Sequence, residues 1–149
     1  MTHYSAYNTP ATILLVEDDE VDIEGILRAF RKQNIDHPIK IVRDGVEALN
    51  VLRGAEGYSR LRQPYLILLD INMPRMNGIE FLQALRKDTL LESSIVFVLT
   101  TSNAMEDKMA AYNEQVAGYL LKNNVGVEFT NLLTMLSAYW RVVEFPPED

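Results

Sequence analysis

Apolar residues gather in five short runs, at 13–16 (ILLV), 39–42 (IKIV), 66–69 (LILL), 95–99 (IVFVL) and 117–121 (AGYLL). These runs largely lack the apolar–polar alternation of a strand with one face in water, so they predict strands that are covered on both faces. Strands of this kind belong to a parallel sheet enclosed between two layers of helices.

Between these runs, apolar residues recur at the three- and four-residue spacing of amphipathic helices. We expect helices over Asp19–Lys32, from the cap Asp44 through Leu52, from Gly78 onward, over Ala104–Glu114 and over Thr130–Val143. Each strand is therefore followed by a helix, and right-handed crossovers then give a doubly wound α/β fold. The expected sheet has five parallel strands in the flavodoxin-like order 2-1-3-4-5, with helices on both faces.

The composition indicates one globular domain. The chain has 149 residues, 48 % of them hydrophobic, which suits a single core. We expect this domain over 13–143, with tails at 1–12 and 144–149. No apolar run approaches the ~20 residues of a membrane span, and the N-terminal segment lacks the apolar stretch of a signal peptide, so we expect a cytoplasmic protein.

Charge and cysteine content exclude several classes of function. The formal net charge of −7 argues against binding to nucleic acid or to an anionic membrane, because phosphate recognition needs clustered cations. The chain has no cysteine, which excludes disulfides, zinc–thiolate sites and thiol catalysis.

Chemically active side chains follow four of the five strands. Glu17 and Asp18 follow the first, Asp70 the third, Thr100 the fourth and Lys122 the fifth. Any one of them would usually be a turn residue, a helix cap or a solvated charge. The carboxyl ends of parallel strands share one edge of the sheet, where ligands of doubly wound folds bind. Turn chemistry does not account for their convergence at that edge.

Such a group of side chains suits metal-assisted phosphoryl transfer. Clustered carboxylates repel one another and need a cation to stay ionised, and oxygen ligands alone select a hard ion, Mg²⁺ or Mn²⁺. Asp70 would be the nucleophile that carries the phosphoryl group as an acyl phosphate. Lys122 and the ion would offset charge on the transferring oxygens, and Thr100 would hydrogen-bond one of them.

Four segments of the chain, ILLVEDDE, LLDINMPRMNG, FVLTTS and GYLLK, resemble the receiver domain of two-component response regulators, in the same order and over nearly the whole chain. The resemblance implies that Asp70 is the phosphoacceptor. It implies a metal site with Asp18 as a direct ligand, Glu17 acting through water and Asn72 contributing its backbone carbonyl. Asp19, one place further on, is expected to cap the helix that follows.

The resemblance also assigns the remaining roles. Thr100 looks like the switch hydroxyl, Tyr119 like the switch aromatic and Lys122 like the phosphate-binding lysine. Tyr119 has a plainer alternative, because an aromatic residue at a strand end is often only packing. The chain departs from the family after Lys122, where Asn123 replaces the usual proline. The loop is then either trans or strained, since a cis bond before a residue other than proline costs ~2.5–4 kcal/mol.

A finer resemblance points to the partner. The insertion RGAEGYSRLRQP and the C-terminal LSAYWRVVEFPPE resemble the stand-alone regulators of cyanobacterial phytochrome histidine kinases. The phosphoryl donor would then be a phosphohistidine of a light-regulated sensor histidine kinase. The protein would be a signalling protein rather than an enzyme, catalysing only its own phosphorylation and dephosphorylation.

The last expected helix carries two apolar stripes. The stripe that should pack on the sheet comprises Phe129, Leu132, Leu133, Leu136, Trp140 and Val143, and beside it lie Met135, Tyr139 and Val142. The second stripe either widens the buried face or forms a homodimer surface through the region of the fourth and fifth helices. The two histidines, His3 and His37, are expected to be solvated.

Two rival functions share this fold type. A phosphatase of the haloacid dehalogenase type also uses a strand-end aspartate with Mg²⁺, but it needs a general acid where this chain has Asn72. A receiver-like scaffold that is never phosphorylated would not need Asp18, Asp70, Thr100 and Lys122 together. Turnover of an aryl phosphate separates the first rival, and labelling by acetyl phosphate separates the second.

Overall fold

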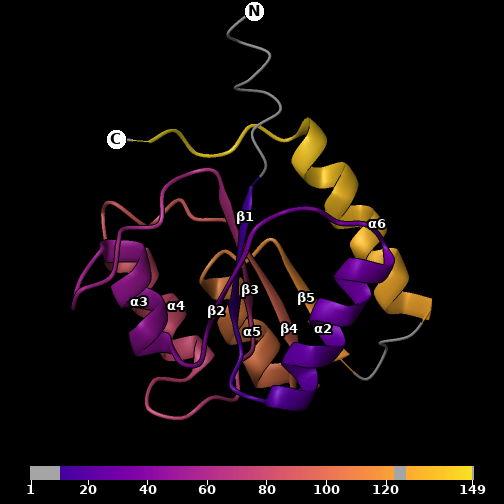
Figure 1. The fold of residues 1–149 in the computed structure, drawn as a ribbon. Helices are drawn as coiled ribbons and strands as arrows, with labels where there is room; N and C mark the ends of the chain where they lie inside the picture. The colour runs from indigo at the N-terminus through magenta and orange to yellow at the C-terminus, as the bar shows by residue number, and fades with distance from the viewer. Residues whose placement is uncertain (1–10, 123–126, 149) are drawn as a thin grey trace, which may run out of the picture.

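The computed structural model describes residues 11–122 and 127–148, with the side chains of 127–133 left aside. Its centre is a five-stranded parallel sheet in the order β2-β1-β3-β4-β5, which confirms the predicted fold class (Figure 1). The strands are β1 (Thr12–Val16), β2 (Ile39–Val42), β3 (Tyr65–Leu69), β4 (Val96–Thr100) and β5 (Gly118–Leu121). Their bounds lie within one residue of the apolar runs that predicted them.

Helices cover both faces of the sheet. They are α2 (Glu20–Lys32), α3 (Gly45–Arg53), α4 (Gly78–Lys87), α5 (Met105–Asn113) and α6 (Val127–Val142). Figure 1 shows α2 and α6 on one side and α3, α4 and α5 on the other, and each layer has its own apolar core. In the part of the chain that the structure describes, no helix combines the length and the apolar character needed to cross a membrane.

Side-chain caps start the helices directly at the carboxyl edge of the sheet. Asp19 accepts a hydrogen bond from the backbone N–H of Asp22 at 3.0 Å, as predicted for the cap of α2. Asp44 accepts the N–H of Glu47 at 2.9 Å, so it caps α3 as predicted. These caps satisfy backbone donors that would otherwise lack partners, and they leave little chain between each strand and its helix.

The register of the strands brings distant parts of the sequence to one edge. Val16 pairs with Leu69, so the residues that follow β1 and β3 emerge side by side. Thr100 pairs with Leu121, which places the end of β4 beside the end of β5, one residue before Lys122. All five residues of β3 are buried. The sheet therefore fixes the backbone on which Asp70 is carried.

The last helix divides its two apolar stripes between core and solvent. Leu136 is fully buried, and the Tyr139 ring meets Phe97 of β4 edge-on with 5.5 Å between centroids. Met135 and Val142 are exposed, at 39 % and 80 %. The second stripe is thus neither wholly buried nor wholly exposed. The side chains of Phe129, Leu132 and Leu133 lie outside the described residues.

His37 contradicts the expectation that it is solvated. Its ring packs against that of Trp140 of α6, with 3.9 Å between centroids and 51° between the ring planes, and its Nδ1 lies 2.9 Å from the carbonyl oxygen of Ala11. Sequence reasoning missed this contact because its partners come from the two ends of the chain. Burial lowers the pKa of His37, although the hydrogen bond to Ala11 opposes that shift. His3 lies outside the described residues.

Replacing Gly78 by alanine should loosen the support of Asp70. A Cβ at Gly78 would lie 2.6 Å from the carbonyl oxygen of Asp70 and 2.7 Å from the Cα of Ile71, so backbone must move. We expect Gly78→Ala to lower the free energy of unfolding by ~1–3 kcal/mol in urea titrations. Gly25→Ala is the matched control, because nothing lies within 4 Å of its Cβ. An equally stable Gly78→Ala variant would contradict this packing argument.

The lowered pKa of His37 predicts a loss of stability in mild acid. The unfolded chain takes up a proton near the ordinary histidine pKa, whereas the folded chain does so only at lower pH, so stability is present above pH ~6.5 and declines below it. Asn carries an amide nitrogen near the position of Nδ1 and does not titrate. Between pH 7 and pH 5, thermal unfolding should therefore show wild type losing stability relative to His37→Asn. Parallel curves for the two proteins would refute the assignment.

Candidate functional site

Three carboxylates meet at the carboxyl edge of the sheet. Glu17 and Asp70 are buried, with 1 % and 6 % of each residue exposed, whereas Asp18 is exposed to solvent. One oxygen from each of the three lies within 4.8 Å of the others. The pairing of β1 with β3 explains the meeting, because each strand delivers its next residues to the same point. The structure thus brings together the acids that the sequence pattern singled out.

Lys122 reaches into this cluster from the end of β5. Its ammonium group forms an ion pair with Glu17, lies 2.8 Å from Oδ2 of Asp22 and lies 3.5 Å from Oδ2 of Asp70. Only 8 % of the lysine side chain is exposed. Asp22 was not foreseen, although its place in the first turn of α2 put it beside the acid pair. The acidic cluster therefore has an internal cation on one side and Asp18 facing water on the other.

Burial and charge shift the protonation of this cluster. Burial raises the pKa of Glu17 to about 7, and the neighbouring Asp70 charge adds to the shift, while the hydrogen bond from Lys122 opposes it. Burial alone would lower the pKa of Lys122, but hydrogen bonds to Asp22 and Glu17 outweigh it and raise that pKa to about 12. Lys122 is therefore a full cation, and the carboxylates that it faces still carry more negative charge than it balances.

The donor set fits a hard divalent cation. The three side chains that could hold a metal are carboxylates, and such oxygen ligands suit Mg²⁺ or Mn²⁺ rather than a softer metal. Two buried acids fix the position, and the exposed Asp18 leaves one side open to water. Asn72 follows closely, and its backbone N–H donates to Oδ1 of Asp70 at 3.4 Å. A cation at this point would offset the burial and the Asp70 charge that together raise the pKa of Glu17.

Thr100 and Tyr119 flank the cluster through the loop that follows β4. Thr100 is fully buried at the last position of β4, and its hydroxyl accepts the N–H of Ser102 at 3.3 Å. The Tyr119 hydroxyl donates to the carbonyl oxygen of Ser102 at 2.8 Å. Ser102 in turn bonds the carboxylate of Asp107 in α5. Thr100 and Tyr119 therefore hold the same loop residue, a link that the sequence did not reveal.

The bond between Lys122 and Asn123 cannot be described, because Asn123 lies outside the described residues. The departure from the family pattern at this position therefore stays a sequence observation. Lys122 itself nevertheless reaches Glu17, Asp22 and Asp70. The usual proline after this lysine is not required for those contacts.

Comparisons with known proteins agree with this architecture. A family model described as the response regulator receiver domain matches residues 13–136. Response regulator Rcp1 of Synechocystis sp. is 34 % identical over 133 residues, which cover 89 % of this chain and 90 % of Rcp1. The residues that the family model matches include both the carboxylate cluster and Lys122.

Solved structures extend the comparison. The Mn²⁺-bound form of response regulator Rcp1 gives a TM-score of 0.78 at 33 % identity and covers 93 % of this chain and 100 % of that one. The phosphorylated cyanobacterial phytochrome response regulator RcpA gives a TM-score of 0.82 at 31 % identity, with the same coverage. On the fold, the carboxylate cluster and these matches, the chain belongs to the response regulator receiver domain family.

Proposed function

We propose that this protein is a single-domain response regulator that accepts a phosphoryl group onto Asp70 from a phosphohistidine of a sensor histidine kinase, one of phytochrome type. The observation that carries the proposal is the buried Asp70 carboxylate, grouped with Glu17 and Asp18 and 3.5 Å from the Lys122 ammonium. The similarity to Rcp1 and to the phytochrome regulator RcpA supports the choice of partner.

The transfer needs a nucleophile and positive charge. An oxygen of Asp70 forms a bond to phosphorus as the bond from phosphorus to the histidine nitrogen breaks, and the histidine keeps the electron pair. Lys122 neutralises negative charge that arrives on the phosphoryl oxygens. Asp18, Asp70 and the backbone carbonyl of Asn72, with Glu17 through water, would hold Mg²⁺ or Mn²⁺, which would offset further negative charge on the phosphoryl oxygens. Water later hydrolyses the acyl phosphate and restores the carboxylate.

The signal leaves through the loop after β4. A phosphoryl group on Asp70 offers a new acceptor to the Thr100 hydroxyl, which now accepts from the Ser102 N–H. A shift of Thr100 disturbs Ser102, and the Tyr119 hydroxyl bound to Ser102 follows. This is a two-state switch biased by local charge. In this role Tyr119 acts as the switch aromatic rather than as packing alone.

The surface that would change lies on α5 and α6. Met105, Met109 and Tyr112 of α5 are all more than half exposed and recur at the spacing of one helical face. Met135 and Val142 add exposed apolar surface on α6. This region is the candidate contact for a homodimer or a downstream partner. The phosphatase alternative gains no support, since Asn72 stands where its general acid would be.

Asp70→Asn should abolish labelling by acetyl phosphate in the presence of Mg²⁺, because an amide cannot form the acyl phosphate. Wild type should gain one phosphoryl group by intact-protein mass spectrometry. The same loss should appear when the donor is an autophosphorylated phytochrome-type histidine kinase. Asp88→Asn is the control, because Asp88 pairs with Arg53 and not with the cluster. Labelling that persists on Asp70→Asn, or is absent from wild type, would sink the proposal.

Removal of the cation should both stop labelling and lower stability. A cation that binds only the folded state stabilises it by ~2.7 kcal/mol at one hundred times its dissociation constant. Mg²⁺ should therefore raise the melting temperature of wild type, and EDTA should reverse the rise. Asp18→Asn should lose most of this effect, whereas Asp36→Asn, another exposed acid, should keep it. An unchanged Mg²⁺ response in Asp18→Asn would refute its role as a ligand.

A further inference from the structure

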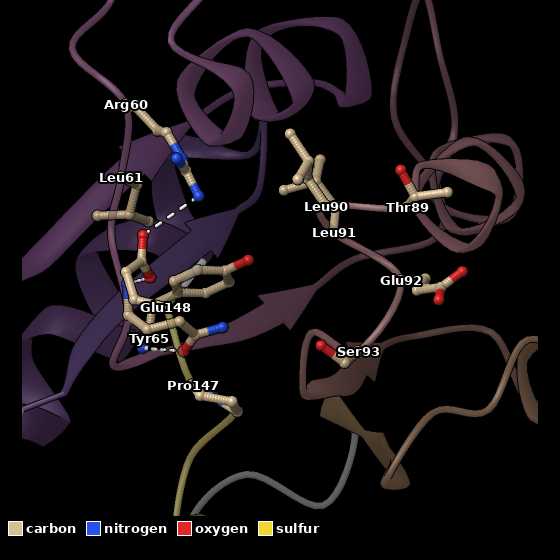
Figure 2. A pocket seen from close by; sticks show the side chains of 11 residues that line it. Arg60, Leu61, Tyr65, Thr89, Leu90, Leu91, Glu92, Ser93, Pro147 and Glu148 are labelled. Carbon is tan, nitrogen blue, oxygen red and sulfur yellow. Dashed lines mark hydrogen bonds and ion pairs between the residues drawn. The ribbon is translucent and has the colours of Figure 1, made fainter.

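The C-terminal tail carries the carboxylate of Glu148, which three donors bind. Oε2 of Glu148 accepts the backbone N–H of Gln63 at 2.7 Å. Oε1 lies 3.2 Å from Nη2 of Arg60 (Figure 2). The same oxygen lies 3.4 Å from Nη1 of Arg62. We use the name carboxylate cradle for the side chains of Arg60 and Arg62 with the N–H of Gln63. The cradle lies in the segment before β3, at the opposite end of that strand from Asp70.

The tail is held at a second point closer to α6. The Phe145 ring meets Tyr139 edge-on with 6.4 Å between centroids, and Tyr139 meets Phe97 of β4 in the same way. Figure 1 shows the tail leaving α6 and crossing the end of the sheet where β1 begins. Pro146 and Pro147 separate Phe145 from Glu148, so the extended chain spans about 10 Å between these two residues. The tail therefore ties α6 to the segment before β3.

A cavity of about 160 Å³ lies next to the cradle. Figure 2 shows Pro147 and Glu148 on one side of it and the segment 89–93 on the other. Sites that bind drug-sized molecules are larger, at ~300–1,000 Å³. Arg60 and Glu148 both line this cavity, and its small volume leaves no room beside their ion pair for a bulky organic ligand.

The contacts of Glu148 with the carboxylate cradle select a carboxylate, yet each ion pair among them is weak enough to break and re-form. The side chains of Arg60 and Glu148 are 30 % and 29 % exposed, so water screens their ion pair, and such pairs contribute at most ~1 kcal/mol each. The backbone N–H of Gln63 adds a charge-assisted hydrogen bond with fixed direction. Covalent attachment then presents Glu148 at an effective concentration of order millimolar.

We propose that Arg60, Arg62 and the Gln63 N–H form a carboxylate-binding site whose ligand is the Pro-Pro-Glu tail of this chain. Binding in cis keeps the site occupied. It also fixes the tail that follows α6 across the amino edge of the sheet. The site is separate from the chemistry at Asp70, so it operates whether or not that residue is phosphorylated.

The first test uses full-length, ¹⁵N-labelled protein. In Glu148→Gln the amide proton of Gln63 loses its charged acceptor, so its resonance should move upfield. The heteronuclear NOE of the backbone amides of residues 145 and 148, which flank the two prolines, should fall. Glu144→Gln, which changes an exposed acid of the same tail, should leave both unchanged. Labelling of Asp70 by acetyl phosphate should be the same in all three proteins, which excludes misfolding. A Gln63 resonance that is identical in wild type and Glu148→Gln would overturn the proposal.

The second test supplies the ligand in trans. The C-terminally amidated peptide Phe-Pro-Pro-Glu should bind the Glu148→Gln protein and return the Gln63 amide resonance toward its wild-type position. The peptide Phe-Pro-Pro-Gln should not do so. Adding Arg60→Gln and Arg62→Gln to the Glu148→Gln background should weaken binding of the first peptide by about tenfold, because two charged donors are lost. Equal binding of the two peptides, or no effect of the arginine changes, would overturn carboxylate recognition.

Discussion

The site depends on placing several carboxylates at a nearly dry edge of the sheet without sufficient positive charge. Lys122 is the cation that the chain itself supplies, and it contacts Glu17, Asp22 and Asp70 together. One ammonium group faces three carboxylates, and burial together with the Asp70 charge raises the pKa of Glu17 to about 7 in spite of the hydrogen bond from Lys122. The remaining imbalance favours a divalent cation beside Asp18. The same imbalance would let an arriving phosphoryl group change the local field strongly.

The rest of the fold can be understood as support for that arrangement. Parallel pairing of β1 with β3 sets the two buried acids next to each other. Gly78 allows α4 to begin directly against the backbone of Asp70, where a Cβ would collide with it. Thr100 and Tyr119 both bond Ser102, so one loop connects the site to α5 and its exposed apolar face. A change of charge at Asp70 could therefore alter the exposed face of α5 through the hydrogen bonds of Ser102.

Local patterns predicted the strands and the helix caps, and they singled out acids that the structure brings together at one edge of the sheet. The buried strands are short apolar runs followed at once by polar residues, and the parallel order of the strands brings those polar residues together. The misses all involve contacts between segments remote in sequence. Asp22 reaches Lys122 only because of how α2 docks, and His37 meets Trp140 only after α6 has packed. The partners of Glu148 likewise depend on the path of the tail, which no local pattern encodes.

A double-mutant cycle on Lys122 and Glu17 tests the central claim most directly. Without added cation, Lys122→Met should lower the free energy of unfolding by ~3–5 kcal/mol, because buried carboxylates lose their partner. Glu17→Gln should recover part of that loss in the double variant, since one of the repelling charges is gone. The account predicts this coupling in urea titrations at neutral pH. Strictly additive effects of the two changes would contradict it.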